Sequence, residues 1–191
     1  MAKCVVLLDN SNIFIEGQKF SALQKGVLKA HPEDRSPQDP SWRINFDALL
    51  NHLAEGREIH KAILVGSRPP PNDLVWSSAH RHGFEVIVYD RDSNNREKAV
   101  DTELVVQGTE IIVSSDEPMD LVIASGDRDF IPLVKVAQRR NWTVEMSAFS
   151  SAFSPYGEMA TTVNRVRALD EAFDKIGSCS FEWPIPATEA S

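Results

Sequence analysis

Short apolar runs that end directly in polar or acidic residues constrain the fold of this chain most. Residues 5–8 (VVLL) lead straight into residues 9–12 (DNSN), and residues 121–124 (LVIA) lead into residues 125–129 (SGDRD). Short apolar runs rich in branched side chains predict strands that are buried on both faces. Because amphipathic stretches at helical spacing separate these runs, the sequence predicts an α/β fold with a mostly parallel sheet and helices on both faces.

The predicted strands and helices alternate along most of the chain. Strands are expected at residues 3–8, 58–66, 84–89, 119–124 and 143–148. Helices are expected at residues 10–19, 46–55, from 72, 100–113, from 130, 155–163 and 170–176. This alternation predicts one domain rather than separate helical and β domains.

The 191 residues of the chain fit a single domain that buries an ordinary core. We expect this domain at residues 1–177, followed by a loosely ordered C-terminal tail at 178–191. Within it, residues 20–43 lose helical periodicity and contain several prolines. A loop of that length is usually functional or disordered, so we expect a flexible insertion beside the end of the first strand.

The bulk composition excludes several classes of function. No apolar run approaches the length of a membrane span, so we expect no membrane association and a cytoplasmic protein. The chain carries 20 basic and 28 acidic residues, a net charge of −8. That balance argues against broad binding of duplex DNA, which depends on many contacts from Lys and Arg to phosphates. The sequence leaves the oligomeric state open, including a homo-oligomer.

Three aspartates are expected to meet where the strands end. Asp9 and Asp127 each follow a predicted strand, and Asp101 lies on the apolar face of the predicted 100–113 helix. Residues just past the carboxyl ends of parallel strands share one crevice. Two carboxylates there at a separation of about 4 Å repel by about 4 kcal/mol at an effective dielectric near 20. The cluster therefore predicts a hard divalent cation and, with it, phosphate chemistry.

Helix capping is the simpler explanation for most of these acidic residues. Asp9 could cap the helix that follows it, and Asp129 could cap the helix that begins at Phe130. Asp101 is harder to explain in this way because its carboxylate faces the sheet, where an unpaired charge is costly. The residues alone leave both explanations open.

Basic residues near the predicted site could contact a phosphate backbone. Arg91, Arg96 and Lys98 lie in a charged loop after the third predicted strand, and Arg128 lies between Asp127 and Asp129. Acidic residues are equally frequent in the 90–98 loop, so an ordinary solvated loop is the alternative there.

Three motifs together resemble the NYN domain, a group of PIN-like nucleases, and within it the LabA-like branch. They are residues 9–12 (DNSN), residues 99–101 (AVD) at the start of a helix, and residues 125–130 (SGDRDF). The resemblance extends from about residue 4 to about residue 173. It implies a PIN-like domain with five or six parallel strands in the order 3-2-1-4-5, and an acidic Mg²⁺ or Mn²⁺ site where that order reverses.

The resemblance also assigns roles to residues. It implies that Asp9, Asp101 and Asp127 are metal ligands and that Asp129 is a ligand or lies directly behind one. Asn12 would orient Asp9 or the attacking water. The chain departs from the family pattern in its long 20–43 segment and at Ala99, where glycine is frequent.

These features favour a metal-dependent ribonuclease, an endoribonuclease that hydrolyses single-stranded RNA with Mg²⁺ or Mn²⁺. The alternative is an RNA-binding or regulatory module that keeps the fold without catalysis. Retention of every aspartate favours the enzyme, because concentrated negative charge does not help a module bind phosphate. A metal-dependent phosphatase is a third candidate, but the Asp127-Arg128-Asp129 spacing follows the fourth strand rather than the first.

Overall fold

A six-stranded sheet forms the centre of the molecule in the computed structural model, which describes residues 2–26, 37–68, 73–90 and 100–181. Its order is β4-β3-β1-β5-β6-β7, and each neighbouring pair is parallel. The six strands are β1 (Lys3–Asp9), β3 (Glu58–Arg68), β4 (Glu85–Asp90), β5 (Asp120–Ala124), β6 (Thr143–Ala148) and β7 (Arg165–Ala168). A separate antiparallel pair joins β2 (Trp42–Ile44) to β8 (Gly177–Cys179).

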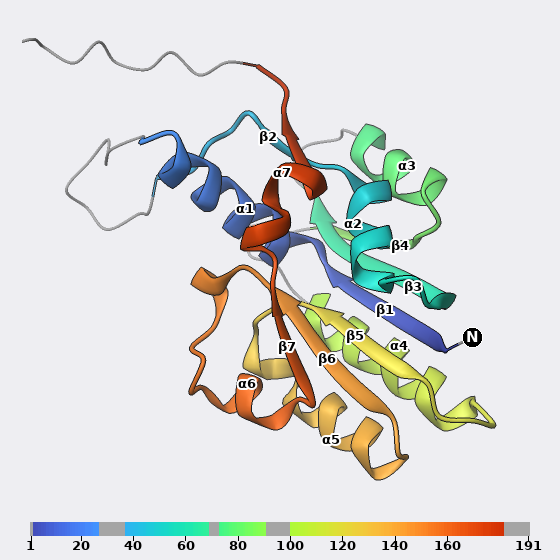
Figure 1. Cartoon of the computed structure of the whole chain (residues 1–191). Helices are drawn as coiled ribbons and strands as arrows, with labels where there is room; N and C mark the ends of the chain where they lie inside the picture. The colour runs from blue at the N-terminus through green and yellow to red at the C-terminus, as the bar shows by residue number, and fades with distance from the viewer. Residues whose placement is uncertain (1, 27–36, 69–72, 91–99, 182–191) are drawn as a thin grey trace, which may run out of the picture.

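Helices cover both faces of the sheet (Figure 1). On one face lie α1 (Asn10–Gln24), α2 (Phe46–Ala54), α3 (Asp73–Arg81) and α7 (Phe173–Ile176). On the other lie α4 (Val100–Ser114), α5 (Ile131–Arg139) and α6 (Glu158–Thr162). Three single 3₁₀ turns complete the described elements: η1 (Arg128–Phe130), η2 (Ser150–Ala152) and η3 (Asp170–Ala172).

The side chains of β1 alternate between two separate hydrophobic cores. Val6 and Leu8 pack in the core under α1 and α2, whereas Val5 and Leu7 pack in the core under α4 and α5. This alternation follows from the two-residue period of a strand. The α/β fold and the predicted order of the five expected strands are confirmed, with β7 added as a sixth strand at the edge.

The segment expected to be a flexible insertion is largely packed where it is described. Helix α1 continues to Gln24, and Trp42 in β2 is 1% exposed. Residues 27–36 lie outside the described residues. The expected C-terminal tail likewise begins with β8, which pairs with β2. Short strands with few apolar residues give little periodic signal, which is why both were missed.

Asp39 fixes the chain as it enters β2. Its carboxylate is 2% exposed and forms an ion pair with the ammonium of Lys25. It also accepts hydrogen bonds from the hydroxyls of Ser21 and Ser41. Burial alone would raise the pKa of Asp39, but Lys25 and the two serines outweigh it and hold the pKa well below its usual range.

Trp42 joins the two chain ends in one aromatic cluster. Its ring stacks on Phe173 with the ring centroids 5.8 Å apart and lies edge-on to Phe149. A β-carbon at Gly17 or Gly177 would lie 2.3 Å or 2.2 Å from the indole, so both positions require glycine. Trp42 is therefore held between α1 and the first residue of β8.

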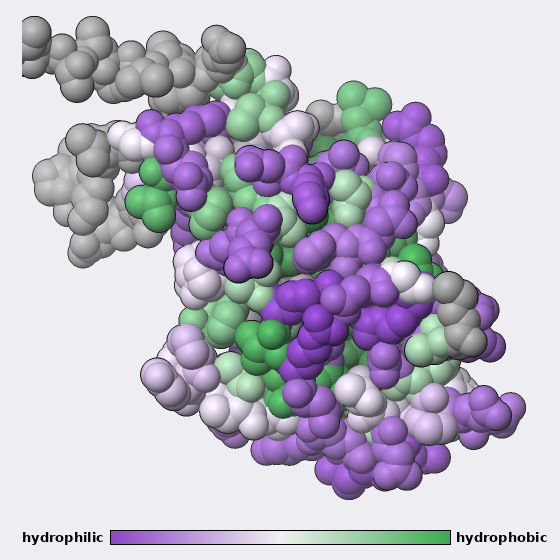
Figure 2. All heavy atoms as spheres, viewed as in Figure 1, coloured by the Kyte–Doolittle hydropathy of each residue, from purple (hydrophilic) through white to green (hydrophobic). Residues whose placement is uncertain are grey.

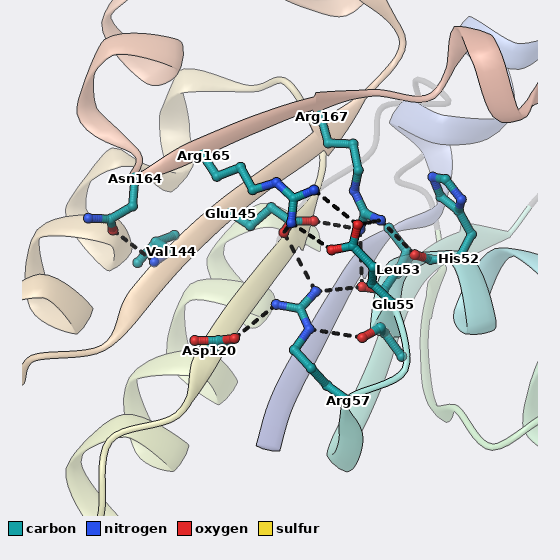
Figure 3. Close-up of polar contacts among 11 residues, drawn as sticks. His52, Leu53, Glu55, Arg57, Asp120, Val144, Glu145, Asn164, Arg165 and Arg167 are labelled. Carbon is teal, nitrogen blue, oxygen red and sulfur yellow. Dashed lines mark hydrogen bonds and ion pairs between the residues drawn. The ribbon is translucent and has the colours of Figure 1, made fainter. Parts of the chain in front are cut away.

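Charged side chains, rather than a helix, cover β6 and β7 on the α2 face. Figure 2 shows strongly hydrophilic residues gathered across the middle of this face, between α2 and α6 as Figure 1 labels them. Glu145 on β6 is 3% exposed and forms ion pairs with Arg57, Arg165 and Arg167 (Figure 3). Because arginines replace apolar residues here, β7 has no apolar run that could have predicted it.

The arginines of this network also bind the end of α2. Arg165 makes two hydrogen bonds to Glu55, at 2.6 Å and 3.0 Å, and this pairing lowers the pKa of Glu55. Arg167 donates to the backbone carbonyls of His52 and Leu53. Figure 3 shows these contacts converging on Glu145 and Glu55, so the network fastens β7 to α2.

Candidate metal centre

The carboxyl ends of β1 and β5 lie side by side at the centre of the sheet. Leu8 pairs with Ala124 in the parallel register, which brings Asp9 next to Ser125. The strand order reverses at this point, because β3 and β4 lie beyond β1 on one side and β5 to β7 on the other. Open parallel sheets bind their ligands at such a switch point.

A hydrogen-bonded loop connects Asp9 to the chain after β5. Ser125 is fully buried, and its hydroxyl donates to Asp9 Oδ2 at 3.0 Å. The same hydroxyl accepts from the backbone N–H of Asp127 at 3.2 Å. Asn12 contributes twice, because its backbone N–H donates to Asp9 Oδ1 and its side-chain oxygen accepts from the N–H of Gly126. The start of α1 and the loop after β5 therefore form one rigid unit.

Three carboxylates meet beside this loop. Asp101, Asp127 and Asp129 each offer an oxygen, and these oxygens all lie within 4.8 Å of one another. Asp101 and Asp127 are partly buried, whereas Asp129 is exposed. Carboxylate oxygens are the donors that Mg²⁺, Mn²⁺ and Ca²⁺ prefer. The three residues thus fit a hard divalent cation, with one side of the cluster open to solvent.

The trio differs from the set that the resemblance implied. Asp101 and Asp127 belong to both sets, and Asp129 joins them in the trio. Asp9 is 6% exposed and accepts a hydrogen bond from Ser125, and its role as a metal ligand stays a prediction. Asp9 therefore supports the loop that carries Asp127. Asn12 contacts both Asp9 and Gly126 rather than Asp9 alone.

Close packing of α4 brings Asp101 to the site. A β-carbon at Gly108 would lie 2.8 Å from both Leu7 and Leu133, so glycine lets the helix lie directly on β1. At the start of the helix, the Tyr89 hydroxyl donates to Glu103 at 2.7 Å. This hydrogen bond, together with one from Gln107, lowers the pKa of Glu103, and it raises the pKa of Tyr89. The first turn of α4 is thereby tied to the end of β4.

Helix capping and clustering occur together rather than as alternatives. Asp9 caps α1 by accepting from the N–H of Asn12, and Asp127 caps η1 by accepting from the N–H of Asp129. Asp129 was the expected cap of the next helix, but Phe130 holds that position and no side chain caps it. The capping bond of η1 therefore orients Asp127, which is also a member of the cluster.

The structure describes one of the four basic residues that were expected to contact substrate. Arg128 is exposed between Asp127 and Asp129. Arg91, Arg96 and Lys98 lie outside the described residues.

Sequence reasoning did not single out Ser125 or the need for Gly126. Ser125 carries the bond between Asp9 and the Asp127 loop. A β-carbon at Gly126 would lie 2.6 Å from the backbone oxygen of Ala152, which explains why glycine stands there. Their position directly after an apolar strand was the available signal, and it indicated only a tight turn.

Fold and site together define a three-layer α/β domain with an acidic cluster at the switch point of a parallel sheet. The family model of the NYN domain matches residues 4–169. The chain therefore belongs to the NYN domain family, as its three motifs indicated.

A solved structure has the same fold. A protein of unknown function from Vibrio parahaemolyticus aligns with a TM-score of 0.62 and 19% sequence identity, over 89% of this chain and 94% of that chain. No curated protein matches this chain. Among the helices of the described residues, none has the length and apolar composition to cross a membrane.

Proposed function

We propose that this chain is a divalent-metal-dependent ribonuclease that hydrolyses phosphodiester bonds of single-stranded RNA. The observation that supports this most is the group of three carboxylate oxygens within 4.8 Å on an NYN fold. Like charges at that separation repel, and a bound cation would offset that repulsion. Membership in a family with a nuclease-like fold supplies the reaction class.

Asp101, Asp127 and Asp129 would hold the metal, since they supply oxygen donors from two separate elements. When bound, Mg²⁺ or Mn²⁺ lowers the pKa of a coordinated water and stabilises charge on the attacking and leaving oxygens. Asp129 is the exposed member and can accept the proton of the attacking water. Arg128 is exposed beside it and can offset charge on the phosphate.

The residues behind the cluster keep it in place. Asp9, Ser125 and Asn12 fix the loop after β5, so that Asp127 keeps its position when substrate binds. Such preorganisation matters because a small displacement of a catalytic group is costly in rate. Arg91, Arg96 and Lys98 remain predicted phosphate contacts.

The net charge of −8 limits how RNA can bind. A negatively charged protein gains little from nonspecific contact with a polyanion, so binding should depend on the metal. We expect RNA affinity to fall sharply when EDTA replaces Mg²⁺. Tight binding of duplex DNA without metal at physiological salt would contradict this mode of binding.

Cleavage of labelled single-stranded RNA, with and without Mn²⁺, tests the proposal. The parent protein should cleave only with the metal, and Asp127→Asn should lose at least about a hundredfold in rate, as removal of a transition-state-stabilising group typically costs. Asn keeps the cap of η1, so the loop should stay intact. Asp116→Asn is the matched control, since it removes the same charge from an exposed residue just past the far end of α4.

Equal rates for the parent and Asp127→Asn would contradict the proposed site. Metal-dependent RNA binding without cleavage by any form would favour the alternative of an RNA-binding module.

A further inference from the structure

A hollow of about 630 Å³ lies beside the first turn of α1. Its walls come from α1, from residues 38–46, from the end of β3 and from α3. Its volume falls in the range of small-molecule sites, about 300–1,000 Å³. Asn10 and Ser11 line it and directly follow Asp9, so the hollow adjoins the loop that supports the candidate metal centre.

The lining of this hollow differs in charge from the metal centre. Phe14 and Trp76 supply aromatic surface, and Arg43 is the one charged residue in the lining given by the described part of the chain. The other polar lining residues are amides and hydroxyls, namely Asn10, Ser11, Gln18, Gln38, Ser67 and Ser78. Among the described residues the lining holds no carboxylate, although the chain has a net charge of −8. This lining would fit a ligand with a neutral, flat, hydrogen-bonding group that is joined to an anion.

Trp76 is held as a fixed wall of the hollow. A β-carbon at Gly66 would lie 2.5 Å from its indole, so the ring rests directly on the backbone at the end of β3. The Cβ atom of Asn10 lies 3.6 Å from the same point. Trp76 and the start of α1 therefore meet over Gly66, on the side of the sheet edge nearest Asp9.

Asn10 adds an acceptor that the protein itself does not use. Its side-chain oxygen is buried and has no hydrogen-bond partner among the described residues. Asn10 lines the hollow, so a rotation of its side chain would bring this oxygen to a ligand N–H, and the cost of leaving a buried acceptor without a donor favours that contact. The exocyclic amines and ring N–H groups of nucleobases are donors of this kind.

We propose that this hollow binds a nucleobase of the RNA strand whose phosphate lies at the metal centre. The inference rests on the proposed ribonuclease function and adds a subsite to it. The base would lie against Trp76 and Phe14, its donors would face Asn10, and Arg43 would lie near the following phosphate. Stacking on aromatic side chains is how proteins hold single-stranded nucleic acid with little sequence preference.

Filling the hollow tests the proposal directly. Ser78 lines it, whereas Ser77, next to it on α3, is exposed and does not. Ser78→Phe should weaken binding of ribonucleoside 5′-monophosphates at least about tenfold, the loss of one stacked base. Ser77→Phe should bind like the parent. Ribose 5-phosphate, which lacks the base, should bind none of the three proteins measurably.

Tryptophan fluorescence provides the readout, because nucleotide bound against Trp76 should change its emission and Trp76→Phe should lose that change. The chain has three other tryptophans, Trp42, Trp142 and Trp183, so Trp76→Phe identifies which indole responds to the ligand. If Ser78→Phe fails to fold, Leu74→Glu replaces it, since Leu74 lines the hollow and is 75% exposed. Ser77→Glu is then the matched control.

Hydrolysis of a base-free activated phosphodiester separates this proposal from the ribonuclease proposal. Ser77→Phe should hydrolyse it at the parental rate with Mn²⁺ and keep the parental KM for RNA, whereas Ser78→Phe should raise the KM for RNA about tenfold. Equal nucleotide binding by Ser78→Phe and the parent, or equal binding of ribose 5-phosphate, would overturn the base subsite while leaving the nuclease intact. Nucleotide binding at Trp76 without hydrolysis of either substrate would instead remove the nuclease assignment and keep the subsite.

Discussion

Carboxylates occur in two very different settings within this one sheet. Glu145, on the face of β6, is 3% exposed and contacts three arginines, each of which binds a second partner (Figure 3). At the carboxyl edge, Asp101, Asp127 and Asp129 place their oxygens within 4.8 Å of one another. The first group is neutralised by the protein itself. The second gathers like charges in a partly open position, which is where a cation from outside can act.

The comparison shows that acidity alone does not identify a functional site. The charges of the Glu145 network sum close to zero, and its arginines tie β7 to the end of α2. Such a network has a structural role, because desolvated charges are tolerated only when they are paired. In the acidic trio, by contrast, Asp127 accepts a hydrogen bond from the backbone N–H of Asp129. Asp9, which is not part of the trio, accepts from the N–H of Asn12 and the hydroxyl of Ser125. Those hydrogen bonds fix the positions of Asp127 and Asp9.

Removing the charge of Glu145 should have the largest effect on stability. Glu145→Gln leaves three arginines facing a neutral group, so we expect a loss of about 3 kcal/mol in the free energy of unfolding. Denaturant-induced unfolding measures it, with the exposed Glu171→Gln as control. A loss below about 1 kcal/mol, the value of a surface pair, would show that the network is solvated rather than structural.

Added metal should stabilise the folded protein through the acidic trio, and the Glu145 network should not affect this gain. With Mg²⁺ at a hundredfold excess over Kd, the parent should gain about 2.7 kcal/mol. Glu145→Gln should gain as much, whereas Asp127→Asn should gain far less. Calorimetry with and without Mg²⁺ or Mn²⁺ compares the three proteins. An unchanged parental melting temperature in both metals would refute the metal centre.

Asp39 is a second carboxylate that the protein itself pairs, and its contribution to stability should depend on pH. Its pKa is lowered in the folded state, so its stabilisation is complete above the usual carboxyl pKa near 4 and is lost as pH falls below it. Asp39→Asn should cost about 2 kcal/mol at pH 7, and the gap from the parent should narrow below about pH 4. Unfolding measured from pH 7 to pH 3 follows this gap. A gap that stayed constant with pH would mean that packing, not charge, stabilises this position.

The smallest expected effect has the opposite sign. In metal-free protein, Asp127→Asn relieves repulsion within the trio while keeping the cap of η1, so it should stabilise the fold by about 1 kcal/mol after solvent screening. Asp116→Asn, just past the opposite end of α4, should leave stability nearly unchanged. Melting temperatures in EDTA provide the measurement. If Asp127→Asn melts lower than the parent, the carboxylate serves as a cap and not as part of a repelling cluster.

The sequence was most informative where burial imposes a pattern. The apolar runs of β1, β3 and β5 predicted their strands, and the order of the sheet followed from the family resemblance. The meeting of Asp101 with Asp127 also followed, because strand ends share one edge in a parallel sheet. The strands and the meeting of Asp101 with Asp127 depend on period and position, which a single chain displays directly, whereas the strand order depended on the resemblance.

Structure held by polar contacts was not predictable in this way. Strand β7 reads Arg-Val-Arg-Ala, and its arginines are positioned by Glu145 and Glu55, which lie far away in sequence. Helix α1 was expected to end before Phe20, yet Phe20 packs on Phe173 from the other end of the chain. Asp9 is joined to the loop that carries Asp127 through the hydroxyl of Ser125. Contacts of this kind carry no periodic signal.

The position of Trp42 between Gly17 and Gly177 has a consequence for how the chain is made. Synthesis delivers α1 (Asn10–Gln24) well before the glycine that begins β8. Until that glycine arrives, the indole lacks one of its two walls, and the stacking of Trp42 on Phe173 is missing as well. A chain cut at residue 169, where the family match ends, would lack both contacts, so we expect it to be less stable than a chain that reaches Cys179.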